Sequence, residues 1–156
     1  MTRYVHRRST VANVNYHIVW STKRRKRIIV PELAADLKIW MDEAANKHGF
    51  TVRMAECGHR DHVHVFASAP PSIAVSYILQ ILKGTTSRNA FTKYGFLSRV
   101  YPGKHMWNPS SSIETIGCIS EGVIRKYIAN QDHDGITEKH DVKHGSQKEK
   151  GLVPHP

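Results

Sequence analysis

The chain has 156 residues and carries 23 Lys and Arg against 13 Asp and Glu, a formal net charge of +10. With 40% hydrophobic and 23% charged residues, it suits one globular domain plus a tail. The two cysteines are too few for a disulfide framework, and no apolar run follows the basic N-terminus or is long enough to span a bilayer. We therefore expect a cytoplasmic protein with a polyanionic partner, nucleic acid ahead of an anionic membrane surface.

Hydrophobic periodicity divides the chain into strands and helices. β-Branched and aromatic residues indicate the strands, and apolar residues at helical spacing indicate the helices. In chain order, we first expect a strand over Asn13–Thr22, a short strand over Ile28–Val30 and a helix over Pro31–Lys47 ended by Gly49. A strand over Phe50–Cys57, a hairpin turn at Gly58–Asp61 and a strand over His62–Ser68 follow, and then a helix capped by Ser72 that runs past Gly84 towards Arg88. The last expected elements are a loop over Tyr94–Pro109, a strand over Ser112–Cys118 and a helix over Glu121–Asn130 capped by Ser120.

This order is the β-α-β-β-α-β pattern of a ferredoxin-like fold with one helix appended. The sequence therefore predicts an α+β domain built on an antiparallel sheet. We assign residues 1–131 to this domain. The polar segment 132–156 has few apolar residues, so we expect a partly disordered tail there.

Two histidines stand two residues apart in the expected strand that begins at His62. Residues at this spacing point to the same face of a strand, so His62 and His64 project together while Val63 and Val65 face the core. Two imidazoles so placed can bind one metal ion. The competing interpretation is a pair of half-exposed surface histidines.

The last expected helix carries Tyr127 and Gln131, four residues apart and so on one helical face. A tyrosine near a helix end is commonly a packing residue with its hydroxyl at the surface. Beside a metal ion, its phenolate can instead attack a phosphate and form a covalent phosphotyrosine.

Several cations and aromatics are candidates for contacts with nucleic acid. The five consecutive cations at residues 23–27 form either a solvated turn or a phosphate-binding patch, and the sequence leaves both interpretations open. The candidate phosphate contacts are Lys23, Arg24, Arg25, Lys26, Arg27, Lys83 and Arg88. The candidates for stacking on unpaired bases are Trp20, Tyr94, Tyr101 and Trp107.

Together these pieces resemble the single-tyrosine HUH transposases of the insertion-sequence 200/605 family, in which HUH denotes histidine, hydrophobic residue, histidine. His62-Val63-His64 stands in that place, and Ser120 to Gln131 is similar to the tyrosine motif Ser-x-x-x-Ile-x-x-Tyr-Ile-x-x-Gln. The opening strand with its basic run, the Pro70-Pro71 helix entry, the segment from Leu82 to Arg88, and Trp107 also match. The likeness covers about residues 11 to 131.

The resemblance implies an RRM-like antiparallel sheet with helices on one face and a C-terminal catalytic helix. His62, His64 and Gln131 would bind Mg²⁺ or Mn²⁺. Tyr127 would attack single-stranded DNA at hairpin-bearing element ends, forming a 5′-phosphotyrosine and releasing a 3′-hydroxyl, without ATP or a nucleotide cofactor. Each chain offers one nucleophile and excision needs two cuts, so a homodimer is expected.

Three rival functions stay open. A domesticated nickase of repeat hairpins, or a replication or plasmid nickase, would use the same chemistry. A non-catalytic ferredoxin-like nucleic-acid-binding module would expose aromatic residues such as Phe66 on its sheet. A small metal-binding regulator would have no need of Tyr127.

Overall fold

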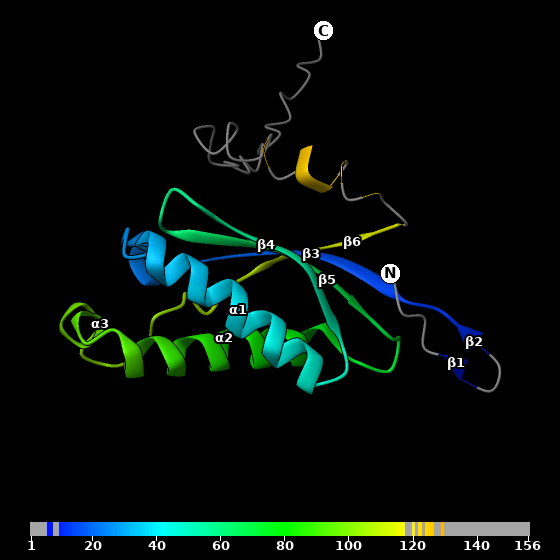
Figure 1. The fold of residues 1–156 in the computed structure, drawn as a ribbon, viewed down its shortest axis with the longest axis horizontal. Coiled ribbons are helices and arrows are strands. Elements are labelled where there is room, and N and C mark those ends of the chain that lie inside the picture. The colour runs from blue at the N-terminus through cyan, green and yellow to red at the C-terminus, as the bar shows by residue number, and fades with distance from the viewer. Residues whose placement is uncertain are drawn as a thin grey trace, which may run out of the picture.

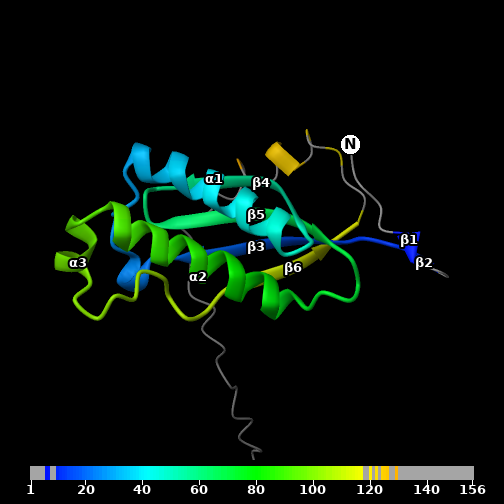
Figure 2. The ribbon, with the colours of Figure 1, turned by 60° about the horizontal axis from the view of Figure 1, so that its bottom comes forward.

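The computed structural model describes residues 6–7, 10–117, 120, 122, 124–126 and 129. Four strands form one antiparallel sheet (Figure 1), and their order across it is β4-β5-β3-β6 (Figure 2). They are β3 (Val14–Ser21), β4 (Thr51–Gly58), β5 (His62–Ala69) and β6 (Ser112–Ile116). The first and third of these strands along the chain lie at the centre of the sheet. This confirms the expected ferredoxin-like α+β fold.

The two long helices, α1 (Pro31–Lys47) and α2 (Val75–Lys93), cover the same face of the sheet (Figure 2). Between this helix layer and the sheet lies the main hydrophobic core. Its fully buried side chains include Ile18, Trp20, Val63 and Val65 from the strands and Leu33, Leu37, Met41, Ile78 and Leu82 from the helices. The opposite face of the sheet is not covered by α1 or α2, and it carries the candidate site.

The first helix and the hairpin follow from local sequence. Pro31 occupies the first turn of α1, and Gly49 has a φ of +81° just beyond its C-cap, so both bounds of this helix match the expectation. The turn between β4 and β5 places His59 and Arg60 at φ values of 43° and 63°. This left-handed pair reverses the chain and fixes which residues of β5 face outward.

The second helix and its entry differ from the expectation. The N-cap of α2 is Ala74, without a side-chain cap hydrogen bond, so Ser72 lies in the preceding turn and does not cap it. The helix also runs past Arg88 to Lys93, because its buried stripe continues through Thr86 and Ala90.

The segments around the sheet also contain corrections. Ile28–Val30 forms no strand, because Ile28 N bonds to Lys26 O and Val30 N to Ile28 O, both two residues back, while Ile29 N bonds to Arg60 O at 3.0 Å. A short helix, α3 (Phe96–Val100), lies within the expected loop, and a 3₁₀ turn, η1 (Lys23–Arg25), occupies part of the basic run. A small hairpin of β1 (His6–Arg7) and β2 (Thr10–Val11) precedes the sheet. Among the described helices, none has the length and apolar character that crossing a membrane requires.

Candidate active site on the histidine face

Alternate residues of β5 point to opposite faces of the sheet, as the sequence predicts. Val63 and Val65 belong to the core under the helices. His62 and His64 face the other way, yet their exposed fractions are only 9% and 3%. Their ring centroids lie 5.0 Å apart. The interpretation as half-exposed surface histidines is therefore wrong, because both imidazoles are buried side by side.

A third histidine, His17, lies behind His64. The register pairs His17 of β3 with Phe66 of β5, so it shares the face of the candidate ligands. Its Nε2 lies 3.1 Å from His64 Nδ1, and its ring stacks on Phe66 with centroids 4.7 Å apart. Burial lowers the pKa of His17, although the nearby carboxylate of Glu114 acts in the opposite direction. His17 is therefore a neutral imidazole at neutral pH.

The surroundings of His17 assign the proton positions. Glu114 Oε2 lies 3.8 Å from His17 Nδ1, which favours a proton on that nitrogen. His17 Nε2 is then an acceptor, and His64 Nδ1 is the donor. This assignment leaves the lone pair of His64 on Nε2, the nitrogen through which a neutral imidazole with this tautomer can bind a metal ion.

A carboxylate performs the same task for His62. The Nδ1 of His62 lies 2.7 Å from Asp61 Oδ1, and Arg25 Nε donates to Asp61 Oδ2 at 3.4 Å. Donation from Nδ1 to the carboxylate places the lone pair of His62 on Nε2. Carboxylates and other acceptors behind metal-binding imidazoles commonly fix the tautomer and the ring orientation in this way.

The described residues supply only part of a metal-binding set. Within them, no group of three or more His, Cys, Asp or Glu side chains is arranged to hold a metal ion. Gln131, the expected third ligand, and Tyr127, the expected nucleophile, lie outside the described residues. Imidazole nitrogens are common ligands of divalent transition metals, so the two histidines fit such an ion by donor chemistry, but two imidazoles alone do not complete a coordination shell.

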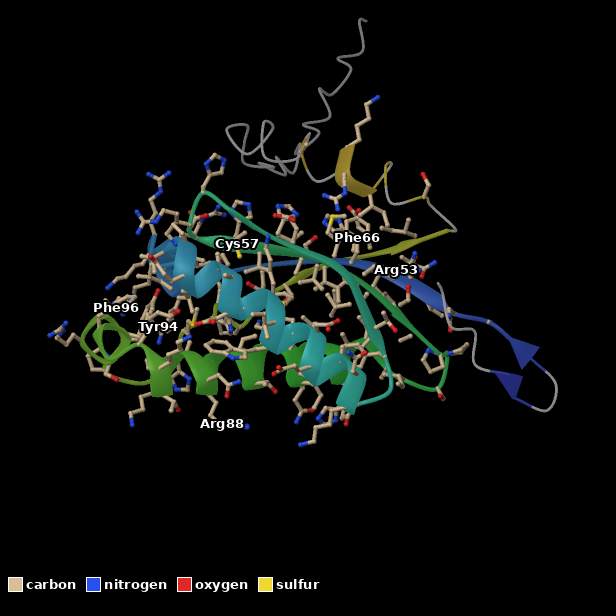
Figure 3. The ribbon with its side chains drawn as sticks, in the orientation of Figure 1. Arg53, Cys57, Phe66, Arg88, Tyr94 and Phe96 are labelled. Atoms are coloured by element: carbon tan, nitrogen blue, oxygen red, sulfur yellow. The ribbon has the colours of Figure 1, made fainter. Side chains whose placement is uncertain are left out.

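A helical segment beyond β6 packs on the histidine face. Ile124 is only 6% exposed, and it forms a small cluster with Phe66, Met54 and Ile116. Figure 3 shows Phe66 directed towards this segment, on the side of the sheet away from α2. Arg125 and Lys126 are exposed. Because Phe66 is two residues from His64, the apolar anchor of this segment lies next to the imidazoles.

The basic run lies at the end of the sheet where His62 is found. Ser21, the last residue of β3, pairs with His62. The next residue, Thr22, is buried and binds Asp61 twice, with its N 2.8 Å and its Oγ1 3.2 Å from Asp61 O. Hydrogen bonds therefore fix the start of the turn that carries the basic run. Arg24 and Arg25 have φ values of 60° and 49°, a left-handed backbone that costs a residue with a Cβ about 1 kcal/mol or more.

The other candidate phosphate contacts lie elsewhere. Lys83 Nζ donates to Asn108 O at 2.7 Å, Pro109 O at 3.2 Å and Ser111 Oγ at 3.2 Å, and burial lowers its pKa. Lys83 therefore ties α2 to the loop before β6. Arg88 is exposed and projects away from the sheet on the helix layer (Figure 3), so the sheet separates it from the histidines.

Trp107 is in the core and not at the surface. It is 7% exposed, packs edge-to-face on Trp20 and donates through Nε1 to Thr86 Oγ1 at 3.0 Å. Trp20 and Tyr101 are likewise buried, at 2% and 5%. Their burial contradicts the expectation that these three rings stack on bases. Tyr94, which is half-buried, donates its hydroxyl to Asp36.

Phe66 also decides against a stacking sheet. It does face outward with the histidines, as a nucleic-acid-binding sheet of this class requires. It is however only 3% exposed, because Ile124 covers it. A base would have to displace this segment to reach the ring.

Sequence reasoning missed Asp61 and His17. A signal for Asp61 was present, because a carboxylate directly before a candidate ligand is within reach of its Nδ1. His17 had no local signal. Its role depends on the register between β3 and β5, which the sequence of either strand alone does not fix.

Comparison with known proteins assigns the family. A sequence model described as "Transposase IS200 like" matches residues 10–131. The ISDra2 transposase TnpA of Deinococcus radiodurans is 35% identical over 127 residues, which span 81% of this chain and 89% of that protein. A transposase of the insertion sequence IS200 from Salmonella typhimurium is 25% identical over 92% of this chain and 87% of its own length. The chain belongs to the IS200-like transposase family.

Solved structures agree with this assignment. A crystal structure from Deinococcus radiodurans, described as that of a transposase, superimposes with a TM-score of 0.66 at 30% identity, covering 81% of this chain and 97% of its own. A REP-associated tyrosine transposase bound to a REP hairpin matches with a TM-score of 0.52 at 14% identity, covering 86% and 75%. The second likeness concerns the fold alone.

Proposed function

We propose that this chain cuts and rejoins single-stranded DNA through a covalent tyrosine intermediate. The phenolic oxygen of Tyr127 attacks the scissile phosphorus, the bond to the 3′ oxygen breaks, and the 5′-phosphate stays on the tyrosine. The phenolic proton leaves and the departing 3′ oxygen gains one. The released 3′-hydroxyl then attacks a phosphotyrosine at another end, which restores Tyr127 and joins the strands. Each phosphodiester bond broken is replaced, so neither water nor ATP is consumed.

The packing of Ile124 against Phe66 carries this proposal. Tyr127 and Gln131 follow Ile124 by three and seven residues in the sequence, and residues at these spacings share one face of a helix. We therefore expect the face anchored at Phe66 to carry both side chains towards His62 and His64. That expectation would bring a nucleophile and two imidazoles to one place.

We further propose that His62, His64 and Gln131 hold a divalent ion, Mg²⁺ or Mn²⁺. The hydrogen bonds behind both imidazoles support it, because Asp61 and His17 leave each lone pair on Nε2. Two nitrogen ligands suit Mn²⁺ better than Mg²⁺. A bound divalent ion polarises the scissile phosphate and neutralises charge that develops on it.

Two chains are expected to act together, because one nucleophile per chain must serve two cuts. β6 is an edge strand of the sheet, with exposed side chains along Ser112–Thr115. An edge strand of this kind can pair with the same strand of a second copy in a twofold arrangement. We propose element ends with hairpins as the DNA substrate; the structural relative described with a REP hairpin has the same fold.

The decisive experiment uses a hairpin-bearing single strand taken from the DNA beside the gene, labelled at either its 5′ or its 3′ end, with Mg²⁺ or Mn²⁺. We expect the wild type to retain the downstream 5′-phosphate fragment as a covalent adduct on a denaturing gel. Tyr127→Phe should give no adduct. Tyr77→Phe is the matched control, because Tyr77 is an exposed tyrosine on the helix layer.

Binding without an adduct in either metal would reject the transposase reaction for this chain and favour the non-catalytic binding module. An adduct that persists in Tyr127→Phe would place the nucleophile elsewhere. Cutting of dispersed repeat hairpins, without joining of element ends, would favour the domesticated nickase.

A further inference from the structure

Five residues of the described chain combine a left-handed backbone with a side chain other than glycine. They are Arg24, Arg25, His59, Arg60 and Lys104, with φ values of 60°, 49°, 43°, 63° and 55°. Glycine, asparagine and aspartate are the residues that usually occupy such positions. Here every one is Arg, Lys or His. We call these five residues the basic rim.

Hydrogen bonds join two of the three segments that carry the rim. Ile29 N donates to Arg60 O at 3.0 Å, and Arg60 Nε returns to Ile29 O at 3.4 Å. Arg27 Nε donates to His59 O at 3.1 Å. The turn after β3 and the hairpin between β4 and β5 therefore form one surface.

The third segment, which carries Lys104, is tied to the same turn. Lys23 N donates to Met106 O at 2.7 Å, and Tyr101 donates its hydroxyl to Lys23 O at 2.9 Å. Lys104 N donates to Tyr101 O at 2.9 Å. In Figure 1 the hairpin, the basic turn and the chain after α3 lie at one end of the molecule.

The rim adjoins the candidate metal ligands. The rings of His59 and His62 have centroids 5.8 Å apart. Arg25 binds Asp61, and Asp61 binds His62. All five rim residues are exposed, so the charges of Arg24, Arg25, Arg60 and Lys104 face solvent and not the core.

We propose that the basic rim binds the backbone phosphates of single-stranded DNA and leads the strand to His62. This inference rests on the proposed function and adds His59, Arg60 and Lys104 to the substrate path. Left-handed turns fix where each side chain leaves the backbone, so the cations form an ordered surface. Contacts of this kind fix the position of the strand without reading its sequence.

The test uses glycine substitutions, which should weaken DNA binding by removing a charge but should not strain the left-handed backbone. Arg60→Gly and Lys104→Gly each remove one charge but suit the left-handed backbone. Affinity for a labelled thymidine oligonucleotide, which has no hairpin, should fall about fivefold per variant at 0.1 M salt. The slope of log K against log salt should become shallower by about 0.7. The melting temperature of Lys104→Gly should stay unchanged or rise, whereas Arg60→Gly also loses the 3.4 Å hydrogen bond to Ile29 O.

Alanine variants at the same positions separate charge from backbone. Arg60→Ala and Lys104→Ala should lose the same affinity as the glycine variants, but their melting temperatures should be lower than those of the glycine variants. Lys47→Gln is the matched control for net charge. It removes an exposed cation from the far end of α1, about 24 Å along that helix from Pro31, and should leave the affinity and its salt slope unchanged.

Wild-type affinity in the glycine variants would overturn the proposal. An equal loss in Lys47→Gln would show that net charge alone matters and would overturn it as well. A loss confined to a double-stranded probe would reject the assignment to single strands. Because binding is measured without cleavage, these outcomes are distinct from failure of the Tyr127 reaction.

Discussion

Both faces of the sheet carry deeply buried side chains, but those under the helices are apolar and those on the other face include histidines. On the face under the helices, Ile18, Val63 and Val65 are fully buried among apolar neighbours. Full burial of such a side chain contributes about 1.5–3 kcal/mol. On the other face, His17 and His64 are nearly as buried, at 2% and 3% exposure. Burying a polar ring is unfavourable unless it is hydrogen-bonded.

The histidine face therefore lowers stability unless its polar network is complete. The hydrogen bond from His64 to His17 and the one from His62 to Asp61 offset part of that cost. Burial alone does not distinguish a packing residue from a functional one on this sheet. What distinguishes them is whether the buried atom is polar and which partners orient it.

The largest expected effect on activity distinguishes two neighbouring residues of β5 that lie on opposite faces of the sheet. His64→Ala should reduce formation of the covalent adduct by at least about a thousandfold, because it removes a proposed metal ligand. Val65→Ala should lower the free energy of unfolding by about 2–3 kcal/mol, because it leaves a cavity under the helices. Its adduct formation should stay within a few-fold of the wild type at low temperature.

Urea denaturation and adduct assays on both variants check this pair. The unfolding free energy of His64→Ala should fall by about 1–3 kcal/mol, since His17 Nε2 loses the donor. Loss of activity in Val65→Ala at a temperature where it is fully folded would contradict the separation of the faces.

A smaller effect is expected from the carboxylate behind His62. In Asp61→Asn, the amide can present its NH₂ group to Nδ1 and favour the wrong tautomer. Affinity for Mn²⁺ measured by calorimetry should then fall about 10–100-fold. Nitrogen-15 NMR of the imidazoles gives a second readout, because the Nδ1–H tautomer of His62 should lose population.

The control for this change is Asp42→Asn, which makes the same substitution on the exposed surface of α1, where Asn46 Nδ2 donates to Asp42 Oδ2 at 3.4 Å. It should bind Mn²⁺ as the wild type does. If Asp61→Asn also bound the ion with unchanged affinity, the Asp61 carboxylate would not be needed to orient His62, and its contact with Arg25 would be its remaining role among the described residues.

The fold could be predicted because its determinants are local. Pro31 and Gly49 bound α1 by the conformations they favour, and the period of two in β5 assigns His62 and Val63 to opposite faces. The end of α2 could not be predicted in this way. Gly84 suggests a weak point, but tertiary burial of Thr86 and Ala90 carries the helix through it.

The site was only partly predictable, because half of it is made by contacts between segments. The pair His62 and His64 is visible in one strand. His17 joins it through strand register, and Lys83 and Trp107 turn inward because the loop before β6 packs on α2. Charge and aromaticity in a sequence do not reveal which side chains the fold uses for itself. The roles of Tyr127 and Gln131 stay predictions.

The smallest expected effect is a pH dependence of the metal-free protein. His17 has a folded-state pKa below the ordinary 6.5, because burial disfavours its charged form. Below about pH 6.5 the unfolded chain therefore binds a proton that the folded chain does not. The free energy of unfolding should fall as the pH decreases from about 6.5 towards 5.5, by about 1 kcal/mol at most from this group.

Urea denaturation with EDTA at pH 7.5, 6.5 and 5.5 measures this loss, and His17→Gln identifies its source. The glutamine oxygen can still accept from His64 but does not titrate, so the variant should lose less stability over this interval than the wild type. Asp36, whose pKa is lowered by hydrogen bonds from Lys93 and Tyr94, stays ionised throughout and contributes no slope. An equal dependence of the unfolding free energy on pH in both proteins would assign the effect to other groups. Protonation of His17 would then make no contribution to the stability of the histidine face between pH 7.5 and 5.5.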